Sequence, residues 1–260
     1  MFDIQDVGAR FYTYISTLHY VMEAAAENNI KLIVVDRPNP NGHYVDGPVR
    51  ELNLKSFIGM HPVPIVHGMT IGEYAKMING EHWLENKVVC NLTVMPLKNY
   101  THDTYYSLPI KPSPNLPNDK AINLYPSLDI FRGTIINVGR GTNFQMQCYG
   151  APFFPKSDFS YIPKPNEGDK HPRFENKICY GVDLRNEPTL HKFTLKYIID
   201  AYNKTPKSET FFGPTFTVHA GNEILQKQIE SGLTEEEIRM TWQEDLENFK
   251  KIRAKYLIYK

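Results

Sequence analysis

Two carboxylates near the start of the chain, Asp3 and Asp6, lie three residues apart in the segment FDIQDVGAR. Two acids at this spacing, at a turn from a strand into a helix, suit general acid–base chemistry. Arg10 and Tyr12 follow closely and add a cation and a phenol. The alternative is structural, with Asp6 capping the helix and Asp3 pairing with Arg10, and the spacing alone does not decide between the two.

A second polar cluster, Asp36-Arg37-Pro38-Asn39-Pro40, directly follows an apolar run. The two prolines stiffen it, because proline fixes φ and removes an amide donor. An acid, a cation and an amide held in this way suit recognition of hydroxyls or a carboxylate. The alternative is a solvent-facing turn in which Asp36 pairs with Arg37. His67 precedes another predicted helix and could bind substrate or position a carboxylate, although a lone loop histidine is more often structural.

The motifs of several large enzyme classes are absent from the sequence. The segment 139–142 (GRGT) lacks the phosphate-loop pattern, no Gly-x-Ser-x-Gly elbow occurs, and no Gly-x-Gly-x-x-Gly follows a strand. Cys90, Cys148 and Cys179 form no zinc or redox motif, although one disulfide is possible in an exported protein. We therefore expect no metal and no cofactor, and a sugar or another small polyol as the ligand.

The composition is that of a globular protein without a broad surface for polyanions. Lys and Arg number 29, as do Asp and Glu, so the formal net charge of the 260 residues is zero. This balance argues against nucleic acid as a partner. The sequence shows no signal peptide and no apolar run of about 18 residues, so we expect no transmembrane helix.

A strand–helix–strand order is predicted to position the acids. Apolar residues recur every three or four positions over 10–28, which predicts a helix. The run 31–36 (KLIVVD) predicts a strand buried on both faces and therefore parallel to its neighbours. With a strand at residues 1–4, the polar clusters fall at the carboxyl ends of strands, where open α/β folds bind ligands. A helix from Thr70, opened by a capping box with Glu73, and a strand over 87–97 follow.

The second half of the chain has less regular patterning. It predicts an α/β protein with a partial Rossmann-like parallel sheet over residues 1–135 and a smaller α+β C-terminal domain over 136–260. Residues 150–180 are rich in proline and aromatic side chains and show little periodicity. The expected elements are a helix at 119–125, strand-like residues at 130–138, helices at 189–203 and 222–231, and one long helix after Thr234.

Several strings together resemble the NamZ-type exo-β-N-acetylmuramidases, formerly a domain-of-unknown-function family. They are FDIQDVGARFYTYI (2–15), VVDRPNPNG (34–42), DGPV (46–49), PVPIVHGMTIGEYA (62–75), PSPNLP (112–117), NVGRGT (137–142), YGAPF (149–153) and the tail from Gln228. The resemblance implies a glycoside hydrolase that releases N-acetylmuramic acid from the non-reducing ends of peptidoglycan fragments, without a cofactor. It also implies a periplasmic or extracellular location for the full-length protein, in cell-wall turnover or recycling.

The resemblance carries over to residues on the matched strings. Asp6 or Asp36 is expected to supply a catalytic acid, and the residues expected to line the substrate cleft are Asp3, Arg10, Tyr12, Arg37, Asn39, His67, Asn115 and Arg140. Family members carry roughly a hundred further N-terminal residues, a region the size of a small domain. That region holds the Gly-Pro-Glu-His-Gly motif whose glutamate is the favoured catalytic acid, and no such motif occurs in this chain. The alternative function is therefore an inactive or sugar-binding remnant of the family.

Overall fold

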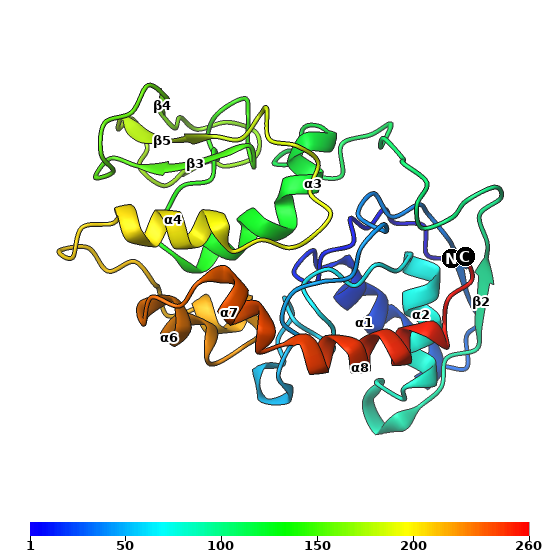
Figure 1. Ribbon diagram of the computed structural model, residues 1–260. Coiled ribbons are helices and arrows are strands. Elements are labelled where there is room, and N and C mark those ends of the chain that lie inside the picture. Colours follow the sequence, from blue (N-terminus) through cyan, green and yellow to red (C-terminus); the bar gives the residue numbers. More distant parts are fainter. Residues whose placement is uncertain (260) are drawn as a thin grey trace. The chain divides into compact units, whose positions relative to one another are not determined.

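The computed structural model describes residues 1–259, which form two compact units (Figure 1). The first unit comprises Met1–Tyr106 and Trp242–Lys260, and the second comprises Ser107–Thr241. The C-terminal helix therefore belongs with the N-terminal part of the chain. The domain ranges 1–135 and 136–260 stay a prediction. The two compact units have other boundaries, after Tyr106 and before Trp242, because the last segment of the chain belongs to the first unit.

A small parallel sheet lies at the centre of the first unit. Strand β1 (Leu32–Val35) pairs in parallel with β2 (Leu92–Met95), with Leu32 opposite Leu92. Phe2 forms a parallel bridge to Val34 through the opposite edge of β1, so β1 is the middle strand. The parallel pairing expected for β1 is confirmed. Strand β2 is shorter than the predicted range 87–97, and the first residue of that range belongs to the 3₁₀ turn η2 (Glu85–Lys87).

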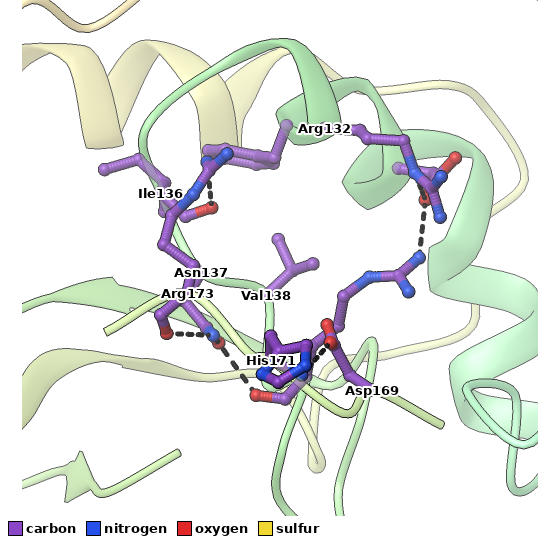
Figure 2. A pocket seen from close by; sticks show the side chains of 10 residues that line it. Arg132, Ile136, Asn137, Val138, Asp169, His171 and Arg173 are labelled. Atoms are coloured by element: carbon purple, nitrogen blue, oxygen red, sulfur yellow. Dashed lines mark hydrogen bonds and ion pairs between the residues drawn. The ribbon is translucent and has the colours of Figure 1, made fainter. Parts of the chain in front are cut away.

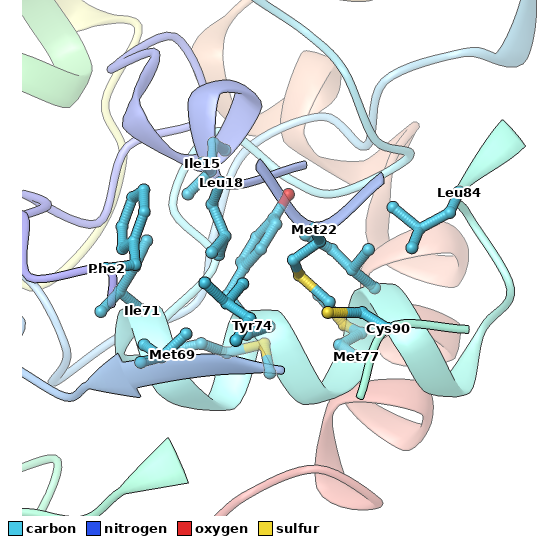
Figure 3. Packing of buried hydrophobic residues seen from close by; sticks show 14 of the residues in the cluster. Phe2, Ile15, Leu18, Met22, Met69, Ile71, Tyr74, Met77, Leu84 and Cys90 are labelled. Carbon is cyan, nitrogen blue, oxygen red and sulfur yellow. The ribbon is translucent and has the colours of Figure 1, made fainter. Parts of the chain in front are cut away.

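Three helices of the first unit enclose the core shown in Figure 3. They are α1 (Tyr14–Glu27), α2 (Ile71–Gly80) and α8 (Gln243–Ala254), and a short 3₁₀ turn, η1 (Leu52–Leu54), lies between β1 and α2. Helix α1 begins four residues later than predicted, because the amide of Arg10 bonds to the carbonyl of Ile65 instead of entering a helix. The capping box of α2 is confirmed: Thr70 accepts from the amide of Glu73, whose side chain accepts from the amide of Thr70.

The second unit contains an antiparallel sheet that the sequence patterning did not indicate. Its strands β3 (Cys148–Ala151), β5 (Cys179–Asp183) and β4 (Ser160–Tyr161) lie in that order across the sheet. They are two to five residues long, so a period-two pattern has too few residues to emerge. The prediction of a strand at residue 130 is wrong, since α3 (Asp119–Leu128) continues directly into the 3₁₀ helix η3 (Asp129–Gly133).

The remaining helices of the second unit are α4 (Lys196–Lys204), α5 (Phe216–Ala220), α6 (Leu225–Glu230) and α7 (Glu235–Met240). Helices α4 and α6 are shorter than the predicted ranges 189–203 and 222–231, and α5 was not predicted. The single long C-terminal helix of the prediction is wrong, because Trp242 has non-helical torsion angles and separates α7 from α8. The structure is thus a mixed α/β protein with a parallel sheet in one unit and an antiparallel sheet in the other. No helix among residues 1–259 has the length and apolar character needed to cross a membrane.

Candidate active site

The strand ends of the first unit bring two predicted residues together. Asp3 follows the Phe2 strand and Arg37 follows β1, and the Nε of Arg37 donates to Oδ1 of Asp3 at 2.7 Å. Both side chains are about 40% exposed. An exposed pair of this kind contributes less than about 1 kcal/mol to stability. The pairs considered from sequence, Asp3 with Arg10 and Asp36 with Arg37, are not the ones formed, and the observed pair is accessible to a ligand.

Asp36 is buried, and protein donors satisfy both of its carboxylate oxygens. Oδ1 accepts from the amides of Arg37 at 3.0 Å and Gly72 at 2.7 Å. Oδ2 accepts from the hydroxyls of Thr70 at 2.7 Å and Tyr259 at 2.6 Å. Burial raises the pKa of Asp36, and these hydrogen bonds oppose the rise. The carboxylate therefore joins β1, the start of α2 and the C-terminal segment, and this arrangement favours a structural role over the predicted catalytic one.

Asn39 is also occupied by contacts within the unit. Its Nδ2 donates to the carbonyl of Met69 at 2.9 Å, and its Oδ1 accepts from the amide of Asn41 at 2.8 Å. Gly8 packs directly against this amide, with φ of +78°, and a Cβ at that position would lie 2.3 Å from Oδ1 of Asn39. The close approach of Asn39 explains why position 8 is a glycine. They favour a scaffold role for Asn39.

Arg10 has no accessible surface. Its Nη1 donates to the carbonyls of Pro48 at 2.9 Å and Val63 at 3.0 Å. Burial, together with the nearby guanidinium of Arg50, lowers the pKa of Arg10 to about 9. Because the side chain is enclosed and bonds to backbone carbonyls, the geometry favours a role in holding two loops together rather than the predicted contact with substrate.

Asp6 and His67 are neighbours, and each side chain has one buried polar atom without a hydrogen-bond partner in the described chain. Oδ2 of Asp6 accepts from the amide of Gly8 at 2.7 Å and lies 3.6 Å from Nε2 of His67. Oδ1 of Asp6 and Nε2 of His67 have no hydrogen-bond partner among residues 1–259. An unpaired buried carboxylate oxygen is energetically costly, so such groups in native proteins often mark functional sites.

The tautomer of His67 follows from its contacts. The amide of Met69 donates to Nδ1 at 3.2 Å, so Nδ1 carries no proton and the neutral ring bears its hydrogen on Nε2, facing Asp6. Burial raises the pKa of Tyr12, and the negative charge of Asp6 adds to the rise. A carboxylate, an imidazole N–H and a phenol together can exchange protons with a bound substrate.

A buried chain of hydrogen bonds that the sequence patterning did not reveal reaches Tyr74, beside His67. Nδ1 of His19 lies 2.9 Å from Nε2 of His61, and Nδ1 of His61 lies 3.0 Å from the hydroxyl of Tyr74. The ring of Tyr74 packs edge-on to His67, with 4.9 Å between centroids. His19 lies on the buried face of α1, where a histidine at helical spacing looks like any core residue, so no sequence signal separates it from a packing position.

Asn115 and Arg140 lie in the second unit. Nδ2 of Asn115 donates to the carbonyl of Gly168 at 2.7 Å, and Nη2 of Arg140 lies 3.4 Å from Oδ1 of Asp129. All three cysteines are buried and free, and residues 1–259 contain no group of His, Cys, Asp or Glu placed to hold a metal ion. Of the predicted residues in the first unit, Asp3 and Arg37 are exposed, and Asp6 and His67 each have an unpaired buried atom. The charge of Asp6 also acts on Tyr12.

Comparisons with known proteins cover the whole chain. Family models for the N-terminal and C-terminal parts of the exo-β-N-acetylmuramidase NamZ match residues 1–120 and 123–259. The peptidoglycan β-N-acetylmuramidase NamZ of Bacillus subtilis (strain 168) is 37% identical over 280 residues, an alignment that covers 100% of this chain and 67% of that protein. The chain thus spans about two thirds of the length of this relative.

Two solved structures of DUF1343 family proteins from Bacteroides fragilis NCTC 9343 have the same fold. One is 47% identical, with a TM-score of 0.95, and the match covers 99% of this chain and 74% of the other. The second is 26% identical, with a TM-score of 0.83, and the match covers 99% of this chain and 73% of the other. Since both family models match and together span nearly every residue, the chain belongs to the NamZ exo-β-N-acetylmuramidase family.

Proposed function

We propose that the protein is a glycoside hydrolase that releases N-acetylmuramic acid from the non-reducing ends of peptidoglycan fragments. The observation that carries this proposal is the buried Asp6, with one unpaired oxygen beside the N–H of His67, in a chain of the NamZ family. The identity of the Bacillus subtilis relative as a peptidoglycan β-N-acetylmuramidase supports the same chemistry. Cell-wall turnover or recycling is the process that such a reaction serves.

Asp6 is the carboxylate of this chain best placed to take part in bond cleavage. Glycosidases use a pair of carboxyl groups that flank the scissile bond. Asp36, the other candidate, has both oxygens occupied by four donors, whereas Oδ1 of Asp6 accepts no hydrogen bond within the described chain. The amide of Gly8 bonds to the other oxygen of Asp6, and Nε2 of His67 lies 3.6 Å from that oxygen. The exposed Asp3–Arg37 pair would contact sugar hydroxyls.

The second candidate function is sugar binding without turnover. It is favoured by one observation: Oδ1 of Asp6 has no partner in the described chain and can accept a hydrogen bond without any reaction taking place. In that case Asp6 would accept a hydrogen bond from a sugar hydroxyl instead of a proton in the reaction. The two functions differ in one measurable outcome, the appearance of free N-acetylmuramic acid.

The experiment incubates the chain, and the protein with any sequence its gene encodes upstream, with the disaccharide MurNAc-β-1,4-GlcNAc. Released N-acetylmuramic acid is quantified by mass spectrometry. We expect Asp6→Asn to lower the rate by about 100-fold or more, as for loss of a general acid or base. Glu247→Gln is the matched control and should leave the rate unchanged, because Glu247 is an exposed carboxylate on α8 that pairs with Lys250. Absence of release by both proteins would refute the hydrolase proposal, and saturable binding would then support the second function.

Two broader expectations belong to the same proposal. The parallel pair β1 and β2 of the first unit, with the parallel bridge from Phe2 on the other side of β1, supports a Rossmann-like arrangement of this part of the family fold. A periplasmic or extracellular location fits a substrate derived from the cell wall. Fractionation of cells that carry a C-terminally tagged protein tests the location, and recovery of the protein only with the cytoplasmic fraction would contradict it.

A further inference from the structure

A cavity of about 380 Å³ lies entirely within the second unit and is rich in arginine (Figure 2). Figure 2 shows Arg132 and Arg173 on opposite sides of the opening, with Val138 projecting towards its centre. The charged and polar lining residues are Asp129, Arg132, Asn137, Arg140, Asp169, His171 and Arg173. Three guanidinium groups therefore face two carboxylates around one small cavity.

The buried side chain of Asn137 fixes the backbone at two of these arginines. Its Nδ2 donates to the carbonyl of Arg140 at 3.1 Å and to the carbonyl of Arg173 at 3.0 Å. Its Oδ1 accepts from the amide of Gly139 at 2.7 Å and from the hydroxyl of Tyr161 at 3.2 Å. One amide thus joins segments more than thirty residues apart in sequence. A cavity whose backbone is fixed before binding loses less entropy when a ligand enters.

The guanidinium groups keep unused donors that face the cavity. Arg132 and Arg140 both contact a single oxygen, Oδ1 of Asp129, at 3.7 and 3.4 Å. Strong charge-assisted bonds are shorter, at roughly 2.7–2.9 Å. Nη1 of Arg173 donates to the carbonyls of Thr134 and Ile136, and its other nitrogens have no partner in residues 1–259. The arrangement leaves several N–H groups available to an anion.

The other wall of the cavity is apolar, which favours an anion that carries an apolar group. Phe131, Ile136 and Val138 line it, and all three side chains are buried. A guanidinium fork matches the two oxygens of a carboxylate. We propose that this cavity binds a carboxylate that carries a small apolar substituent, the chemistry shared by the lactyl ether of muramic acid and an N-acylated alanine. That this carboxylate comes from peptidoglycan rests on the proposed function, whereas the preference for a carboxylate rests on the cavity alone.

The test is isothermal titration of the whole chain with four probes: N-acetylmuramic acid, N-acetyl-D-alanine, N-acetylglucosamine and inorganic phosphate. We expect one or both carboxylates to bind more tightly than phosphate and N-acetylglucosamine. Arg140→Gln is expected to weaken that binding by about tenfold or more, the effect of losing one charged hydrogen bond. Arg132→Gln is a second variant with little risk to folding, since its side chain is 54% exposed. Arg185→Gln, which lies outside the cavity and pairs with Asp183, is the matched control and should bind as the unmodified chain does.

The outcomes separate this proposal from the hydrolase proposal. Carboxylate binding that Arg140→Gln weakens and Asp6→Asn leaves intact would support the cavity site, even if no disaccharide were hydrolysed. Binding of only one of the two carboxylates would support the site and would show whether its ligand is the lactyl group or the acylated alanine. No carboxylate binding, binding unchanged in both arginine variants, or tighter binding of phosphate would overturn the proposal, and hydrolysis by the unmodified chain would still stand.

Discussion

Asp36 provides a sharp test of whether a strand-end acid serves structure or chemistry. Its two oxygens divide their donors by type: Oδ1 accepts from two backbone amides, Oδ2 from two hydroxyls. In Asp36→Asn the retained oxygen can keep both amides, and the new NH₂ can donate to the hydroxyls, which are free to turn. In Asp36→Ala both amides lose their partner, and one of them, that of Gly72, belongs to the first turn of α2, where no intrahelical acceptor exists.

The expected cost follows from these contacts. Each buried donor left unpaired costs about 1–3 kcal/mol, so the two amides give about 2–6 kcal/mol for Asp36→Ala. Asp36→Asn should cost about 2 kcal/mol less than the alanine variant, because both amides stay paired and the burial of a charge is relieved. Asp3→Asn, at the neighbouring strand end, is the matched control and should change stability by less than about 1 kcal/mol, as an exposed pair does.

The assay is urea unfolding followed by tryptophan fluorescence. The chain has two tryptophans, Trp83 and Trp242, and both belong to the first unit, so the signal reports the unit that contains Asp36. A structural role predicts loss of unfolding free energy in the order alanine, asparagine, unmodified chain. Equal losses in the two Asp36 variants, or no loss in either alongside abolished turnover in Asp36→Asn, would refute the structural role and restore Asp36 as a catalytic candidate.

Two further predictions concern the same unit. Burial lowers the pKa of His61 well below its usual value and also lowers that of His19. Below about pH 6.5 the unfolded chain therefore binds more protons than the folded chain, so the folded state loses stability as the pH is lowered. The urea concentration at the unfolding midpoint should be lower at pH 5 than at pH 7, and an equal concentration at both would contradict this. Glu73→Ala should loosen the C-terminal segment, because Oε1 of Glu73 accepts from the amides of Ile258 and Tyr259 and alanine leaves both without this acceptor. Faster carboxypeptidase digestion than in the exposed control Glu247→Ala checks this, and equal rates would count against it.

Local signals in the sequence predicted the first unit better than the second. The apolar run before Asp36 and the capping box at Thr70 depend on neighbours in sequence, and both were confirmed as β1 and the start of α2. The short strands of the second unit and the break at Trp242 depend on packing between distant segments. Periodicity carries no information about such contacts, so these elements were missed or merged.

The sequence by itself determined the family, the parallel start of the fold and the acids at the strand ends. Motif strings and hydrophobic runs are properties of residue order, and they survive without coordinates. Only the tertiary structure decided which acid keeps a free oxygen: Asp36 receives donors from Thr70 and Tyr259, which are 34 and 223 positions away, whereas Oδ1 of Asp6 receives none from the described chain. The arginine cavity of the second unit was likewise invisible in the sequence, because Asn137 joins Arg140 and Arg173 through backbone carbonyls that carry no sequence signature.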